Sequence, residues 1–172
     1  MTEVRRRLVV MRHAKAEPYG PTDHERRLTA RGRGSALEAG RHLREVDLVP
    51  EVALVSSSVR TRETWAAVAE GSGAPEARAT FLETLFAGGP EEVIEAVQAV
   101  PEGVGTVLYI GHNPTATFLA HLLDDGEGEA SAVSGMLRGL PPGALVGLEV
   151  VVPWADLAAE TGRVVDFHVG AS

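Results

Sequence analysis

The stretch Val9-Val10-Met11-Arg12-His13-Ala14-Lys15 joins a short apolar run to an Arg-His pair near the start of the chain. If the apolar residues form a buried central strand, Arg12 and His13 stand at its carboxyl end, the edge where open α/β sheets bind ligands. A guanidinium group beside an imidazole suits an anionic substrate together with a nucleophile or proton carrier. The stretch therefore predicts both a core strand and the position of a site.

Strands and helices are predicted to alternate along most of the chain. Apolar periodicity and turn residues predict strands at residues 5–11, 52–55, 77–81 and 104–110, with helices after Thr29, at 59–70, from Pro90 and from Asn113 to Leu123. Residues 126–143, rich in small side chains, are expected to be irregular and mobile, and residues 144–152 and 163–169 to form closing strands. This alternation predicts an α/β fold, a three-layer α/β/α sandwich with a mainly parallel central sheet.

Length and hydropathy narrow the class of protein. A chain of 172 residues predicts a single domain over residues 1–172. No apolar run approaches the roughly 20 residues that span a bilayer, and the run at 8–11 is shorter than the roughly 7–15 residues of a signal-peptide core. We therefore expect a cytoplasmic enzyme or binding protein without a membrane partner, as a monomer or weak homo-oligomer.

Charge and residue types exclude several chemistries. The absence of cysteine excludes disulfides, thiolate metal sites and cysteine nucleophiles. A net charge of −8 argues against nonspecific nucleic-acid binding, which needs lysine and arginine to neutralise phosphates. His112 and His121 lack a zinc-ligand spacing and no HExxH motif occurs, so we expect neither a metal nor another cofactor. The arginines of the first half could still hold a small phosphate or one phosphorylated side chain.

Polar residues follow the carboxyl ends of four predicted strands: Arg12 and His13, then Arg60, then Glu83, then His112. Guanidinium forks bind and neutralise phosphate oxygens. A neutral imidazole can attack phosphorus, and a second imidazole can donate to a developing oxyanion. A carboxylic acid can protonate a leaving group. Together these groups suit phosphoryl transfer.

These pieces resemble the histidine phosphatase (phosphoglycerate mutase-like) superfamily, in particular its short SixA-type phosphohistidine phosphatases. The segments that match, in the family's order and spacing, are Arg12-His13-Ala14, Arg27-Leu28-Thr29-Ala30-Arg31-Gly32, Ser56-Ser57-Ser58-Val59-Arg60-Thr61-Arg62-Glu63-Thr64 and Gly111-His112-Asn113-Pro114. The resemblance implies a phosphoglycerate mutase-like fold in which His13 is the nucleophile that becomes phosphorylated. Arg12, His13, Arg60 and His112 would then form the phosphate pocket.

Three features refine the resemblance. Ala14 replaces the glycine of the wider superfamily, as in SixA-type members, and Asn113 in place of aspartate argues against the acid-phosphatase and phytase branch. Glu83 falls where many relatives keep a proton donor. Loop acids could also reach the site, namely Glu17, Asp23 and Glu25.

The implied function is a metal-independent phosphatase that acts through a phosphohistidine intermediate on His13, with phosphohistidine in a protein as its substrate. The short chain leaves little material for a cap, so its pocket could admit a side chain of a folded partner. A small-molecule phosphomonoesterase for a sugar phosphate or nucleotide stays open, as does a noncatalytic phosphate- or phosphoprotein-binding module. No role is predicted for the other histidines, which are His24, His42, His121 and His168.

Overall fold

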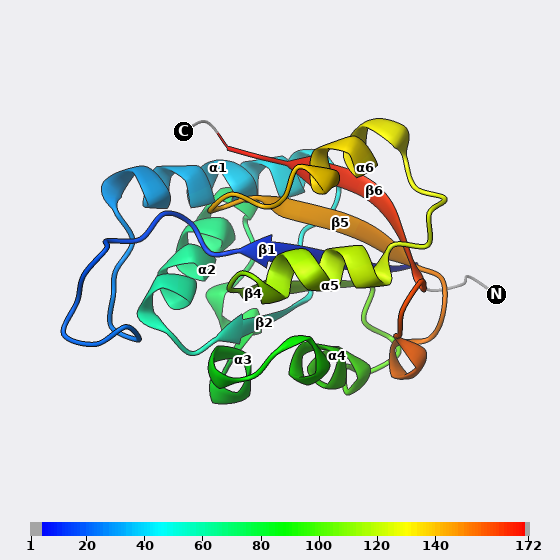
Figure 1. Ribbon diagram of the computed structural model, residues 1–172, viewed down its shortest axis with the longest axis horizontal. Coiled ribbons are helices and arrows are strands. Elements are labelled where there is room, and N and C mark those ends of the chain that lie inside the picture. The colour runs from blue at the N-terminus through cyan, green and yellow to red at the C-terminus, as the bar shows by residue number, and fades with distance from the viewer. Residues whose placement is uncertain (1–4, 171–172) are drawn as a thin grey trace.

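The computed structural model describes residues 5–170 and is built around a six-stranded sheet of order β3-β2-β4-β1-β5-β6 (Figure 1). Its strands are β1 (Arg6–Arg12), β2 (Val52–Ser56), β3 (Ala79–Leu82), β4 (Thr106–Gly111), β5 (Leu145–Val150) and β6 (Gly162–His168). The strands β1 to β4 pair in parallel, whereas β5 is antiparallel to both β1 and β6. The mainly parallel sheet predicted from the sequence is therefore confirmed.

Helices cover both faces of this sheet (Figure 1). One face packs against α1 (Ala30–Glu45) and α2 (Val59–Ser72), and the other against α3 (Glu83–Ala87), α4 (Pro90–Gln98), α5 (Thr115–Leu123) and α6 (Ala130–Leu137). Short 3₁₀ turns lie at Glu76–Arg78 and Trp154–Asp156. Successive residues of β1 alternate between the two cores, with Leu8 and Val10 in one and Val9 and Met11 in the other. The arrangement is the expected α/β/α sandwich.

The helices α1 and α2 approach each other closely because glycines lie at their contact. A Cβ atom added to Gly40 would lie 2.3 Å from the carbonyl oxygen of Val68, and one added to Gly71 would lie 2.2 Å from that of Leu37. Only a residue without a side chain fits at such a backbone contact. This packing fixes α2, the helix that carries Arg60, against its neighbour.

The loop between β1 and α1 is closed at its base by a bridge between its two ends. Thr29 is the N-cap of α1, as predicted, and its hydroxyl accepts from the amide of Gly32. Ala16 pairs with Leu28 in an isolated bridge, so residues 17–27 form a closed excursion between β1 and α1. That excursion reaches the carboxyl edge of the sheet, as the contacts of the site show below.

The helices differ from the expectations at three places. The segment expected to be irregular contains α6, where the Glu129 carboxylate accepts from two amides of the first turn. The helix α3 was not expected, because five residues are too few for a helical apolar period to appear. The helix α5 begins at Thr115 rather than Pro114, after a cis Asn113–Pro114 peptide, although the Asn113 side chain still accepts from the amide of Thr117.

No helix within residues 5–170 has the length and apolarity needed to cross a bilayer.

Candidate active site

The carboxyl ends of β1, β2 and β4 bring the predicted phosphate-pocket residues together. Arg12 ends β1 and His13 follows it, Arg60 lies in the first turn of α2, and His112 follows β4. The imidazole rings of His13 and His112 are 5.4 Å apart between centroids and tilted by 58°. Nη2 of Arg60 lies 3.3 Å from Nδ1 of His112. Residues separated by up to 100 positions in the sequence thus share one edge of the sheet, as adjacent parallel strands require.

His13 is held as a neutral imidazole with a defined tautomer. Its Nδ1 lies 2.7 Å from the carbonyl oxygen of Ala14, and because a carbonyl only accepts, Nδ1 carries the proton. The other nitrogen, Nε2, therefore keeps its lone pair. Burial lowers the pKa of His13 to about 3, and the nearby charges of Arg60 and Arg12 lower it as well. A neutral ring with a free nitrogen is what a nucleophile requires.

Arg12 is anchored by the loop before β5. Its Nη1 donates to the carbonyl oxygen of Leu140 over 3.1 Å, and the side-chain amide of Asn113 donates to the same oxygen over 3.0 Å. Within residues 5–170 no carboxylate forms an ion pair with Arg12, and burial lowers the pKa of its guanidinium. An unneutralised, partly buried guanidinium favours an anion beside it.

Glu83 lies on the rim of this pocket rather than inside it. It is the first residue of α3, directly after β3, and its side chain is 70% exposed. The hydroxyl of Ser57, at the turn between β2 and α2, donates to its Oε2 over 2.6 Å. The structure thus connects Glu83 to the site through Ser57.

Of the three loop acids that were predicted to reach the site, Asp23 is bound by Arg60 in the described part of the chain. Arg60 donates from Nη1 to the backbone oxygen of Asp23 over 2.7 Å and lies 3.2 Å from its carboxylate through Nη2. Arg26 donates to the other carboxylate oxygen over 3.0 Å. Burial raises the pKa of Asp23, but the two arginines outweigh it and hold this pKa below its ordinary value. The carboxylate therefore offsets part of the positive charge of the pocket.

His24, for which the sequence analysis predicted no role, lies beside Ser57 and Phe86 near the predicted site residues. Its Nε2 lies 3.0 Å from the hydroxyl of Ser57, and its ring meets Phe86 edge-on at 4.7 Å. Phe86 in turn meets the ring of His112 at 5.7 Å. The loop that carries His24 crosses the sheet edge and so brings its ring to Ser57 and Phe86. No local sequence pattern predicts this path of the loop.

Two serines that the sequence analysis did not single out hold the histidines. Ser56, the last residue of β2, places its hydroxyl 2.7 Å from Nε2 of His112, and Ser57 contacts His24. Burial lowers the pKa of His112 to about 4, with the charge of Arg60 acting in the same direction.

In contrast, His42 and His168 stack on each other between α1 and β6, with their centroids 4.2 Å apart. No group of three or more metal-binding side chains within residues 5–170 is arranged to hold a metal ion.

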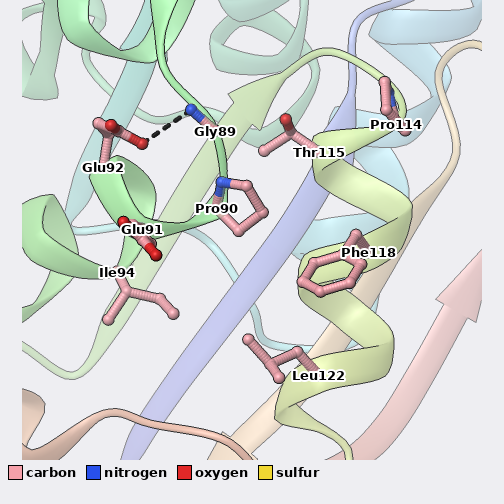
Figure 2. A pocket seen from close by; sticks show the side chains of 9 residues that line it. All are labelled: Gly89, Pro90, Glu91, Glu92, Ile94, Pro114, Thr115, Phe118 and Leu122. Atoms are coloured by element: carbon pink, nitrogen blue, oxygen red, sulfur yellow. Dashed lines mark hydrogen bonds between the residues drawn. The ribbon is translucent and has the colours of Figure 1, made fainter.

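An apolar groove lies beside the site. Figure 2 shows it between the start of α4 and one side of α5. Its volume is about 620 Å³. Its floor and walls are formed by Gly89, Pro90, Glu91, Glu92, Ile94, Pro114, Thr115, Phe118 and Leu122. The carboxylate of Glu92 is bound to the amide of Gly89, as the dashed line in Figure 2 marks. Arg12, His13, Arg60 and His112 do not line this groove, so it is separate from the predicted phosphate-binding residues.

Comparisons with known proteins agree with this geometry. The sequence model of the histidine phosphatase superfamily (branch 1) matches residues 8–102. An uncharacterized protein of Mycobacterium tuberculosis is 37% identical over 161 residues, covering 92% of this chain and 99% of the relative. An uncharacterized protein of Mycobacterium leprae is 33% identical over 164 residues, covering 92% and 99%.

Solved structures show the same fold. A structure from Nakamurella multipartita that is named as a phosphohistidine phosphatase SixA superposes with a TM-score of 0.85 and 31% identity, over 98% of both chains. The protein histidine phosphatase SixA in complex with tungstate superposes with a TM-score of 0.76 and 24% identity, over 95% of this chain and 96% of that one. The similarity therefore extends beyond the matched segment to the closing strands.

Proposed function

This chain belongs to the histidine phosphatase superfamily, and from that premise we propose that it is a metal-independent phosphatase for phosphohistidine in a partner protein. Family membership and the SixA-like neighbours support phosphatase activity as such. The observation that carries the proposal is His13, a neutral imidazole with an unprotonated Nε2, beside two guanidinium groups and a second imidazole.

The proposed reaction has two steps. Nε2 of His13 attacks phosphorus, so that a nitrogen–phosphorus bond forms while the bond to the leaving nitrogen breaks. Arg12 and Arg60 spread the negative charge of the transferring group, and His112, bound to Arg60 and Ser56, lies beside them. Glu83, the proposed acid, protonates the leaving imidazole. Water then attacks the phosphorylated His13, which releases inorganic phosphate and restores the neutral ring.

The exposure of the acidic side chains at the candidate site supports a protein substrate. The side chains of Asp23, which is bound by Arg60, and Glu83, which is bound by Ser57, are 62% and 70% exposed. A phosphorylated imidazole projecting from a folded partner can therefore approach without displacing a lid. The 31% identity to a structure named as a SixA phosphohistidine phosphatase, over 98% of both chains, favours the same substrate class.

The test is a direct comparison of substrates. The protein is incubated with a histidine-phosphorylated phosphotransfer protein and with a panel of monoesters that includes a sugar phosphate and a nucleotide. We expect phosphate release from the protein substrate at the highest kcat/KM, a labelled phosphoenzyme that is stable to alkali, and neither with His13→Ala. Preference for a monoester would assign a small-molecule phosphatase instead, and binding without release would assign a binding module.

A further inference from the structure

We propose that His24 supplies Glu83 with the proton for the leaving group, through the hydroxyl of Ser57. The inference rests on the proposed phosphatase function and concerns how the departing group of that reaction is protonated. In the proposed relay, Glu83 is the residue that meets the leaving group, and His24 and Ser57 are positioning residues that act through it.

The hydrogen bonds of the three side chains define a direction. Ser57 has a single hydroxyl proton, which it donates to Oε2 of Glu83 over 2.6 Å. Nε2 of His24 lies 3.0 Å from the same hydroxyl oxygen, so Nε2 must be the donor in that contact. His24 and Glu83 are 3.9 Å apart at their closest polar atoms, too far for a direct hydrogen bond. The hydroxyl of Ser57 is thus the link between them.

The ring of His24 is held in this position from several sides. Its backbone oxygen accepts from the amide of Val59 over 2.9 Å, which ties the loop to the start of α2. Phe86 of α3 packs edge-on against the imidazole and also contacts the ring of His112. Asp23, the preceding residue, is bound by Arg60. A side chain anchored by its own backbone and by two neighbouring elements keeps a fixed orientation at low entropic cost.

Burial places the relay on the side from which a leaving group departs. His13 and Arg60 are only 9% and 5% exposed, whereas the side chains of His24 and Glu83 are 37% and 70% exposed. In an in-line displacement the leaving group departs opposite the attacking nitrogen. In the proposed relay, an attack from the buried His13 expels the leaving group toward the more exposed Glu83 and His24, where water can return a proton.

The proton balance of the relay closes. The imidazolium form of His24 gives its Nε2 proton to the oxygen of Ser57 while the original hydroxyl proton of Ser57 passes to Oε2 of Glu83. Glu83, now a carboxylic acid, protonates the leaving nitrogen, and the neutral His24 takes up a proton from solvent. Imidazole exchanges protons near neutral pH, whereas a carboxyl group alone is ordinarily ionised there. The relay therefore gives Glu83 a proton donor within the protein, in addition to the solvent.

The experiment uses two substrates that differ in their need for a proton. The leaving imidazole of a phosphohistidine protein needs one, whereas the phenolate of p-nitrophenyl phosphate leaves without it. Single-turnover rates of phosphoenzyme formation are measured for wild type, His24→Asn and Ser57→Ala. Asparagine can still donate to Ser57 but supplies no proton. We expect both variants to lose about 10- to 100-fold with phosphohistidine and no more than about threefold with the aryl phosphate.

Two further measurements exclude a merely structural effect. The charged groups near the relay include Glu83 of α3, Asp23 and Arg26 of the loop, and Arg60 and Arg62 of α2, of which Arg62 donates to the backbone oxygen of Ser57 over 2.8 Å. We expect the pH profile of the rate with phosphohistidine to differ between wild type and His24→Asn, and the profile with p-nitrophenyl phosphate to be the same for both. The double variant should be no more than about twofold slower than either single variant, since both break one relay.

The control is His121→Asn, which changes an exposed histidine of α5 and should leave both rates unchanged. Equal losses with the two substrates, additive losses in the double variant, or no loss in His24→Asn would each overturn the relay. If the wild-type protein forms no phosphoenzyme with either substrate, the proposed phosphatase function itself fails, which is a separate outcome from a failed relay.

Discussion

Nη2 of Arg60 donates to Nδ1 of His112 over 3.3 Å, and this contact defines the protonation of the ring. A guanidinium group has no acceptor, so Nδ1 of His112 holds a lone pair and the proton of the neutral ring lies on Nε2. Nε2 donates to the hydroxyl of Ser56 over 2.7 Å. Both nitrogens of His112 are therefore bound to protein groups in the free protein, and a phosphoryl group must compete for the same arginine.

Replacing Ser56 with alanine should leave the Nε2 proton of His112 without its acceptor and allow the ring to turn. A buried donor without a partner costs about 1–3 kcal/mol. We expect kcat/KM for p-nitrophenyl phosphate to fall about 10-fold and the urea midpoint to decrease. The control is Ser134→Ala on α6, which is exposed and should change neither. Wild-type kinetics in Ser56→Ala would show that this hydrogen bond does not orient the ring.

Asp23→Asn should strengthen oxyanion binding. The carboxylate lies 3.2 Å from Arg60 and offsets part of its charge, while the backbone oxygen that also binds Arg60 is untouched by the substitution. Removing a partly exposed charge at this distance is worth about 1 kcal/mol, or about fivefold in Kd for vanadate at low salt. Asp156→Asn, the same charge change in an exposed turn, is the control. Weaker vanadate binding in Asp23→Asn would contradict this prediction.

The two pocket histidines should stay neutral in mildly acidic solution. Burial, followed by nearby positive charge, lowers the pKa of His13 to about 3 and that of His112 to about 4. We therefore expect their imidazole NMR resonances to show no titration between pH 8 and pH 5.5. His121, which is exposed, serves as the internal reference for a ring open to solvent. A midpoint above pH 6 for either pocket ring would mean that the pocket does not exclude the charged form.

The same pKa shifts predict a loss of stability in acid. Because the folded pKa values lie below the ordinary value of about 6.5, the unfolded chain binds more protons between about pH 6.5 and pH 3. This stability is present above pH 6.5 and is lost as the pH falls toward the folded values. We expect the free energy of unfolding to fall by about 2 kcal/mol per ring between pH 7 and pH 5, and His13→Asn to reduce that slope. An unchanged slope would refute the assignment to His13.

Two glycines of α1 should respond oppositely to alanine. A Cβ atom at Gly40 would lie 2.3 Å from the carbonyl oxygen of Val68, so Gly40→Ala must push α2 away. A Cβ at Gly34 meets nothing within 4 Å, so Gly34→Ala gains helix propensity of up to about 1 kcal/mol. Urea unfolding should show Gly40→Ala destabilised by at least about 2 kcal/mol and Gly34→Ala stabilised. Equal midpoints would mean that the helices can separate freely.

Local patterns in the chain were sufficient for most of the sheet. The apolar runs of β1 and β4 and the turn residues after them predicted both strands and the edge where they end. Since parallel strands share a carboxyl edge, the residues that follow them could be expected to meet, and Arg12, His13 and His112 do. The two helices that were not predicted, α3 and α6, are five and eight residues long, too short for a clear period.

The sequence alone thus predicted the fold class and the meeting of Arg12, His13, Arg60 and His112 at one sheet edge, because apolar periodicity, capping and strand ends are encoded between near neighbours. Only the tertiary structure decided the strand order, the tautomers of the rings and the recruitment of Asp23, His24, Ser56 and Ser57. Their partners lie far away in the chain, as Asp23 with Arg60 and His24 with Ser57 illustrate. Such pairs form where a loop crosses the sheet edge, and no local sequence pattern predicts the position of that loop.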